Sequence, residues 1–151
     1  MPDLIWEIDD EDGVFLTFDD GPTPGVTEWI LSTLDKYDAK ATFFVLGKNV
    51  EMYPDLYKRI LDAGHKVGNH TYSHQKGWGM SLERYTEDVD FANDLIHSEL
   101  FRPPYARITP AQARRAPSWC STTAKRRSAT CVTHFPVRWK RSGRWASNAR
   151  R

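Results

Sequence analysis

Two histidines four residues apart and a pair of adjacent aspartates are the residues of this chain best suited to bind a metal ion. His70 and His74 bound the segment His-Thr-Tyr-Ser-His, and on a helical turn this spacing would place both imidazoles on one face. A carboxylate from elsewhere in the chain would complete a two-histidine, one-carboxylate site with open positions for water and substrate. Asp19 and Asp20 are adjacent at a turn. One of them can therefore ligate the metal while the other stays free as a base.

A third segment, Arg-Pro-Pro-Tyr at 102–105, supplies groups that would complete a hydrolytic site. Water bound to a metal ion loses a proton near neutral pH, and a nearby carboxylate can take that proton as the water attacks. Arg102 would hold the free carboxylate of the aspartate pair. A backbone N–H just after the two prolines would help to bind the developing oxyanion. The chemistry predicted from these three segments is metal-assisted hydrolysis.

Alternating strand and helix patterns determine where these segments lie. Apolar, β-prone runs predict strands at 14–18, 41–46, 66–69 and 100–102. Apolar residues at helical spacing predict helices at 24–37, 54–63 and 81–97. The first of these helices is expected to have Thr23 as its N-cap and Pro24 as its first residue. A further helix is expected to begin at the capping box of Thr109 and Gln112.

Strands that alternate with helices in this way predict parallel βα units. The carboxyl ends of parallel strands face one common side, and active sites are built there. Each of the three segments directly follows an expected strand. We therefore expect them to meet in space although they are distant in sequence.

The same segments resemble the first three motifs of the polysaccharide deacetylases, the carbohydrate esterase family 4 enzymes that carry a NodB-homology domain. The matching residues are Thr-Phe-Asp-Asp-Gly-Pro at 17–22, the histidine segment at 70–74, and Arg-Pro-Pro-Tyr at 102–105. The stretches 39–44 and 64–70 also look like the family's connecting sequence. The resemblance covers about 12–115. A single motif would be weak evidence, but three in order, each in a strand-like context, are specific.

This resemblance implies a distorted (β/α) barrel that binds a divalent metal, usually zinc. It implies hydrolysis of the N-acetyl group of amino sugars in chitin-like or peptidoglycan-like polymers. Carried over residue by residue, Asp19 is the general base and Arg102 orients it. The Tyr105 backbone N–H is the oxyanion donor. The metal ligands are Asp20, His70 and His74.

The sequence also departs from the family pattern. Ala106 stands where the third motif usually has glycine, and neither the fourth motif nor the Leu-x-His of the fifth, which supplies the general acid, is found. The nearest imitation is Val-Thr-His at 132–134. A complete α/β barrel has about 250 residues. We therefore expect an α/β fold that forms an incomplete distorted (β/α) barrel of about four βα units, in which metal binding survives and turnover is severely reduced.

Charge divides the chain into two parts. Residues 1–99 hold all 20 acidic residues beside 8 Lys and Arg, whereas 100–151 hold 13 Lys and Arg and no acid. Apolar periodicity ends near Arg115. We expect 1–115 to be the N-terminal part of a polysaccharide deacetylase domain and 116–151 to be a basic, irregular tail. The joint loss of pattern and motifs motivates the hypothesis that the tail is read out of frame.

Two alternative functions stay open. One is a non-catalytic sugar- or metal-binding remnant, which would bind zinc without releasing acetate. The other is nucleic-acid binding through the tail, whose cations are interleaved with Trp119, Trp139 and Trp145. We do not expect a nucleic-acid partner, because the tail contains no known binding module. The partner we expect is an N-acetylated amino-sugar oligomer or polymer, and the cofactor we expect is a divalent metal, with Zn²⁺ as the first choice.

Sequence features also bear on the cellular location. No apolar run is long enough to cross a membrane. Residues 1–4 lack the basic region and the long apolar stretch of a signal peptide. We therefore expect either a cytoplasmic protein or a longer precursor whose start is missing. Members of the family that this chain resembles are often exported or associated with the cell envelope.

Overall fold

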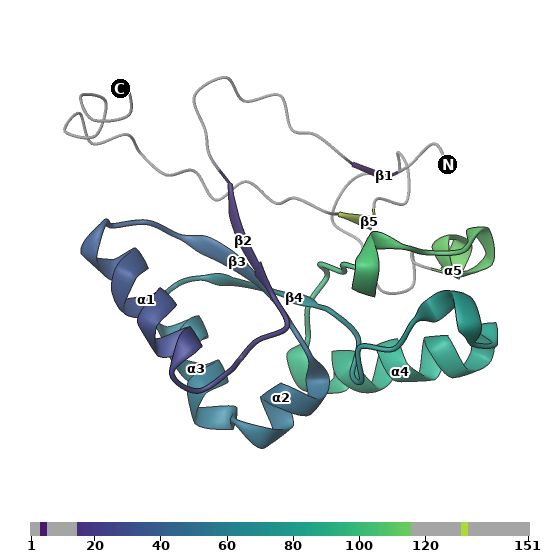
Figure 1. The fold of residues 1–151 in the computed structure, drawn as a ribbon, viewed down its shortest axis with the longest axis horizontal. Coiled ribbons are helices and arrows are strands. Elements are labelled where there is room, and N and C mark those ends of the chain that lie inside the picture. The colour runs from purple at the N-terminus through teal and green to yellow at the C-terminus, as the bar shows by residue number, and fades with distance from the viewer. Residues whose placement is uncertain (1–3, 6–14, 116–130, 133–151) are drawn as a thin grey trace.

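A three-stranded parallel sheet forms the centre of the computed structural model, which describes residues 4–5, 15–115 and 131–132 (Figure 1). The strands, in their spatial order, are β2 (Leu16–Asp19), β3 (Ala41–Val45) and β4 (Lys66–Asn69). Asp19 pairs in register with Phe44, and Val45 pairs with Asn69. The carboxyl ends of all three strands therefore lie side by side.

The central strand is β3, and all five of its residues are buried. Its apolar, β-prone sequence suits a strand that is covered on both faces. The fourth expected strand, 100–102, is reduced to a single parallel bridge between Asn69 and Phe101. Pro103 and Pro104 follow directly, and the ladder cannot continue through them because proline has no N–H.

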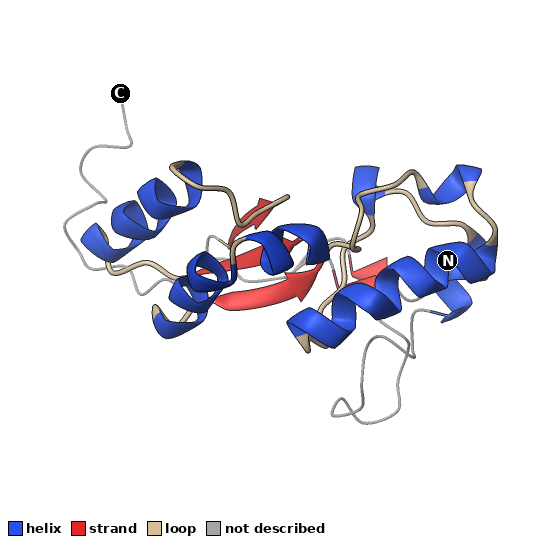
Figure 2. Cartoon of the chain, turned by 90° about the horizontal axis from the view of Figure 1, so that it is seen from below, coloured by secondary structure: helices blue, strands red, loops and turns tan. Residues whose placement is uncertain are grey.

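Helices lie to either side of the strands (Figure 2). They are α1 (Val26–Lys36), α2 (Gly47–Met52), α3 (Pro54–Asp62), α4 (Leu82–Ile96) and α5 (Pro110–Arg115), with short 3₁₀ turns at Gly77–Gly79 and Pro104–Ala106. The capping box predicted before α5 is present. The Thr109 N–H donates to Gln112 Oε1 at 2.9 Å, and the Gln112 N–H donates to Thr109 Oγ1 at 3.3 Å. Parallel strands that alternate with helices confirm the predicted α/β class.

The start of α1 differs from the prediction that Thr23 caps it and Pro24 opens it. The helix begins at Val26, because Gly25 takes a φ of 78° that no helical residue adopts. The carboxylate of Glu28 accepts a hydrogen bond from the Gly25 N–H at 2.5 Å, which satisfies one of the free donors of the first turn. Thr23 instead donates its N–H to Thr27 Oγ1 at 2.8 Å.

The sequence did not predict helix α2, because its six residues show no clear apolar period. Gly47 permits a close approach. A Cβ at Gly47 would lie 2.7 Å from the Tyr72 ring and 3.0 Å from the Ala92 Cα of α4. Glycine at this position therefore lets α2 pack tightly against the histidine loop and α4.

The main core lies between β3 and the helices. Its fully or largely buried members are Leu31, Leu34, Ala39, Ala41, Phe43, Val45, Val50, Ile60, Ala92 and Ile96. A second, smaller cluster joins Tyr85 and Val89 of α4 to Phe101. Both cores use α4, so this helix connects the sheet to the segment that carries Arg102.

Two short strands lie apart from the sheet. β1 (Leu4–Ile5) and β5 (Cys131–Val132) pair in parallel, Leu4 with Cys131 and Ile5 with Val132. The predictions for the rest of the basic tail, 116–130 and 133–151, fall outside the described residues. Within the described part of the chain, no helix has both the length and the apolar character needed to cross a membrane.

Candidate metal centre and active site

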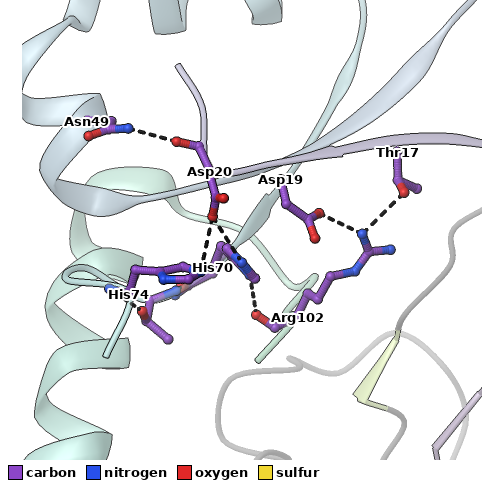
Figure 3. A network of polar contacts seen from close by, with 9 residues as sticks. Thr17, Asp19, Asp20, Asn49, His70, His74 and Arg102 are labelled. Atoms are coloured by element: carbon purple, nitrogen blue, oxygen red, sulfur yellow. Dashed lines mark hydrogen bonds and ion pairs between the residues drawn. The ribbon is translucent and has the colours of Figure 1, made fainter. Parts of the chain in front are cut away.

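Three chain segments that are far apart in sequence meet at the carboxyl end of the sheet (Figure 3). β2 ends in Asp19 and is followed by Asp20, β4 leads into His70, and the bridge at Phe101 leads into Arg102. This is the convergence expected for parallel strands. The prediction that the three segments meet at the carboxyl ends of the parallel strands is therefore confirmed.

Asp20, His70 and His74 form a compact set of potential metal ligands. Asp20 Oδ1 lies 3.1 Å from His74 Nε2 and 3.5 Å from His70 Nε2. One ligand atom from each residue lies within 4.8 Å of the other two, and within the described ranges no second group of this kind is found. His70 is buried, His74 is half-buried, and the Asp20 side chain is exposed. The set therefore opens to solvent on the aspartate side.

The orientation of His70 is determined by a backbone carbonyl. Its Nδ1–H donates to the Arg102 carbonyl at 2.7 Å, which leaves an unprotonated Nε2 facing Asp20. Burial lowers the pKa of His70 below its usual 6.5, although the Arg102 carbonyl and the charges of Asp19 and Asp20 act in the opposite direction. The imidazole is therefore neutral near pH 7, which is the form that binds metals.

The backbone of Asp20 leaves the strand sharply. Its φ is 70°, a left-handed conformation that aspartate tolerates better than most residues. Its N–H still donates to the Phe44 carbonyl at 3.1 Å, and its own carbonyl accepts from Asn49 Nδ2 at 2.7 Å. Asn49 lies in the unpredicted helix α2, so its contribution was not visible in the sequence.

The two histidines do not lie on a helical turn, as their spacing suggested. Residues 70–74 form an irregular loop in which Thr71 has a φ of 69° and His74 a φ of 59°. The His74 N–H donates to Thr71 Oγ1 at 3.1 Å, and the Thr71 N–H donates to Asn69 Oδ1 at 2.8 Å. The imidazole rings approach to a centroid distance of 5.1 Å because the loop folds back on itself.

Asp19 faces Arg102 instead of the histidines. Arg102 Nη1 donates to Asp19 Oδ1 at 2.6 Å and to Thr17 Oγ1 at 3.2 Å. The guanidinium also lies over the Phe44 ring, 4.0 Å from its centroid. The guanidinium of Arg102 is therefore held by three residues of the sheet, namely Thr17, Asp19 and Phe44. Thr17 was not predicted to take part, although it stands two residues before Asp19 on the same strand face.

Tyr105 lies at the edge of the site. Its ring centroid is 4.9 Å from that of His74 and 5.6 Å from that of Trp78, and about half of the tyrosine is exposed. The Lys76 ammonium lies 5.8 Å from the Tyr105 ring and 6.0 Å from the Trp78 ring. Tyr105 and Trp78 therefore form a partly exposed aromatic wall that contacts His74 through Tyr105.

The arrangement defines a class of protein: an α/β fold whose parallel strands present an Asp-His-His set next to an Asp-Arg pair. The family model for polysaccharide deacetylases matches residues 7–119. The chain therefore belongs to the polysaccharide deacetylase family, as its motifs predicted.

Known relatives agree with this assignment. A peptidoglycan-N-acetylglucosamine deacetylase of Bacillus cereus is 41% identical over 115 residues, which are 68% of this chain and 40% of that protein. A chitooligosaccharide deacetylase of Rhizobium leguminosarum bv. trifolii is 40% identical over 89 residues, 59% of this chain and 41% of that protein. This chain thus spans less than half the length of these two relatives.

Solved structures agree on the fold. A family 4 acetyl xylan esterase from Clostridium thermocellum, solved in complex with a cobalt ion, superposes with a TM-score of 0.63 at 34% identity. The match covers 66% of this chain and 52% of that one. The described strands and helices thus form part of the fold of this family, which confirms the predicted partial barrel.

Proposed function

We propose that this protein is a metal-dependent hydrolase that removes N-acetyl groups from amino-sugar polymers. The observation that carries the proposal is the convergence of Asp20, His70 and His74 next to the Asp19–Arg102 pair. The relatives support the substrate class, because they are described as deacetylases of peptidoglycan and of chitooligosaccharide.

The donor set fits a divalent metal. Two imidazole nitrogens and one carboxylate oxygen suit Zn²⁺ and leave positions open for water and substrate. The neutral His70, with its Nε2 facing Asp20, presents its lone pair without first losing a proton. A bound divalent ion would activate water and polarise the carbonyl of the acetamide. We propose Asp20, His70 and His74 as the ligands.

Asp19 is our candidate for the general base. Its carboxylate is bound by Arg102, which orients it and keeps it out of the ligand set. Asp20 leaves strand β2 with a φ of 70°, which turns its side chain away from that of Asp19, so the two carboxylates take separate tasks. Asp19 would accept a proton from the attacking water, and Arg102 would maintain its position during that transfer.

Tyr105 and Trp78 are candidates for contact with the sugar. The Tyr105 backbone adopts a φ of 59°, and its N–H is our proposed donor to the developing oxyanion. Both aromatic rings are partly exposed, Tyr105 lies beside His74, and Trp78 lies against Tyr105. A pyranose ring has apolar faces that aromatic side chains can cover, so this wall would orient the polymer next to the ligands.

Acetate release tests the proposal. The full chain, loaded with Zn²⁺, is incubated with N-acetylglucosamine oligomers, and acetate is measured with an enzyme-coupled assay. We expect slow release, because the motif that supplies the general acid is not found in the sequence. This release should stop when a chelator removes the metal and return when zinc is restored. Zinc binding without acetate release would instead support the non-catalytic remnant. Release that is indifferent to chelation would contradict the metal-dependent mechanism.

A further inference from the structure

A carboxylate outside the ligand set holds the loop that carries both histidines. Asp88 lies on α4, and its Oδ2 accepts hydrogen bonds from the backbone N–H groups of Tyr72 at 3.1 Å and Ser73 at 3.2 Å. Its Oδ1 accepts the Ser73 hydroxyl at 2.6 Å. One side chain thus binds three donors from the middle of the 70–74 loop. Charged acceptors form stronger hydrogen bonds than neutral ones.

The loop depends on such support because of its backbone conformation. Thr71 and His74 both have positive φ values, which are uncommon outside glycine and least favourable for a β-branched residue such as Thr71. A conformation of this kind persists only when the surrounding structure holds it in place. Asp88 holds the stretch between Thr71 and His74, because it accepts hydrogen bonds from the N–H groups of residues 72 and 73.

The two histidines are anchored differently. The ring of His70 is held directly, by the Arg102 carbonyl at 2.7 Å. The described contacts of His74 are its N–H bond to Thr71 Oγ1, its ring contacts with His70 and Tyr105, and its approach to Asp20. The position of His74 therefore depends on the path of the loop more than that of His70 does.

We propose that Asp88 is a positioning residue of the metal centre that acts through the loop on His74. This inference rests on the proposed function, because it takes Asp20, His70 and His74 as the ligands. Groups that orient metal ligands typically change metal affinity by about 10- to 100-fold when they are removed. Asp88 does not touch the metal or the substrate in this proposal, so its effect is on affinity and ligand geometry.

The chemistry of the clamp predicts which substitution preserves it. In Asp88→Asn the amide oxygen can still accept from the two backbone N–H groups, and the amide N–H₂ can donate to the Ser73 hydroxyl after that hydroxyl rotates. Asp88→Leu has a similar shape but no side-chain acceptor. Ser73 then loses both of its bonds to Asp88, and the Tyr72 N–H keeps only the Asp88 backbone carbonyl, 3.2 Å away. We therefore expect Asn to retain zinc affinity within about threefold and Leu to lose about 10- to 100-fold.

The experiment measures the zinc dissociation constant of the full-length protein by competition with a chromophoric chelator. Asp94→Leu serves as the matched control, since Asp94 is exposed on the same helix. Each variant is also compared with the wild type in urea unfolding without metal. If Asp88→Leu does not fold, Ser73→Ala removes one hydrogen bond of the clamp from the loop side. We expect that variant to weaken zinc binding by a few-fold.

A double-mutant cycle separates positioning from general support of the structure. In a His74→Ala background the Asp88→Leu change should weaken zinc binding by less than about threefold, whereas in a His70→Ala background its full effect should remain. Equal effects in both backgrounds would overturn the proposal, as would unchanged zinc affinity in a folded Asp88→Leu or Ser73→Ala variant. If the wild-type protein fails to bind zinc, the proposed metal centre itself is wrong, and the positioning role is wrong with it.

Discussion

At the scale of single residues, a change of backbone direction gives two identical side chains different surroundings. Asp19 is the last residue of β2 and contacts Arg102, while Asp20, with a φ of 70°, turns toward the histidines. The two carboxylates therefore do not compete for one cation.

Replacement of the candidate base should remove catalysis but retain the metal. We expect Asp19→Asn to lower kcat for acetate release by about 10²- to 10⁴-fold, the usual contribution of a general base. Zinc affinity should stay within a few-fold of the wild type, because Asp19 is not one of the proposed ligands. Acetate assays and zinc titrations check the two expectations.

Asp35→Asn is the matched control for this change, since Asp35 is an exposed aspartate on α1 that is not part of the site described above. It should leave both kcat and zinc affinity unchanged. If Asp19→Asn retained full turnover, the base would have to be another residue.

A second residue-scale prediction concerns His65. Burial and the nearby Lys40 charge lower its pKa below 6.5, and its buried Nδ1 has no hydrogen-bond partner in the described part of the chain. As the pH falls through 6.5, the unfolded chain takes up a proton before the folded one does, so the free energy of unfolding decreases. The decrease ends only below the pKa of the folded state.

Urea unfolding of the metal-free protein at pH 7.5 and pH 5.5 measures this effect. The wild type should be less stable at pH 5.5, and His65→Leu should show a smaller loss over the same interval. The buried His70 contributes with the same sign and is present in both proteins. An identical pH dependence in the two proteins would contradict the assigned role of His65.

At the scale of elements, two helices support the site without supplying ligands. Helix α2 supplies Asn49, which holds the Asp20 carbonyl, and α4 supplies Asp88, which holds the histidine loop. The two helices pack closely because Gly47 has no side chain at their contact. Tight packing of this kind transmits a small change in one helix to the loops beside it.

Gly47→Ala tests the close contact between these elements. The added methyl would meet the Tyr72 ring at 2.7 Å and the Ala92 Cα at 3.0 Å, so helix or loop must shift. We expect a loss of about 1–3 kcal/mol in the free energy of unfolding, the usual cost of overpacking. Gly79→Ala is the control, because nothing lies within 4 Å of the position of its Cβ. Urea denaturation of both variants decides the matter, and equal stabilities would contradict tight packing at Gly47.

Elements with a strong pattern were predictable, and short or irregular ones were not. The buried strand β3 and the amphipathic helix α4 lie within one residue of their predicted bounds at each end. Helix α2 was missed because six residues give too little periodicity. Instead of the strand expected at 100–102, the structure has a single bridge at Phe101, because Pro103 and Pro104 end the ladder. The conformation of the 70–74 loop, with positive φ at Thr71 and His74, has no sequence signature, because it depends on contacts with Asp88 and Asn69.

At the scale of the whole molecule, the site joins segments that follow the two outer strands of the three-stranded sheet. Asp20 follows the first strand of the sheet, and the histidines follow the third. An ion held by all three residues would link them directly. Because the unfolded chain lacks this arrangement, binding would stabilise the folded state.

Zinc should therefore raise the stability of the protein. At a free zinc concentration 100 times the dissociation constant, we expect a gain of about 2.7 kcal/mol in the free energy of unfolding. Thermal unfolding with zinc and with a chelator measures the shift in Tm. His74→Ala should reduce the shift strongly. A zinc effect of the same size in that variant would place the bound ion elsewhere.

The sequence by itself determined the family, the α/β class and the residues that meet at the site. Those features depend on local patterns: apolar runs, the order of strands and helices, and three motifs that each follow a strand. Only the tertiary structure decided which groups hold the ligands in place. Asn49, Thr17 and Asp88 act through contacts between segments that are 15 to 85 residues apart. Such contacts depend on packing, and packing is not recorded in the spacing of residues along the chain.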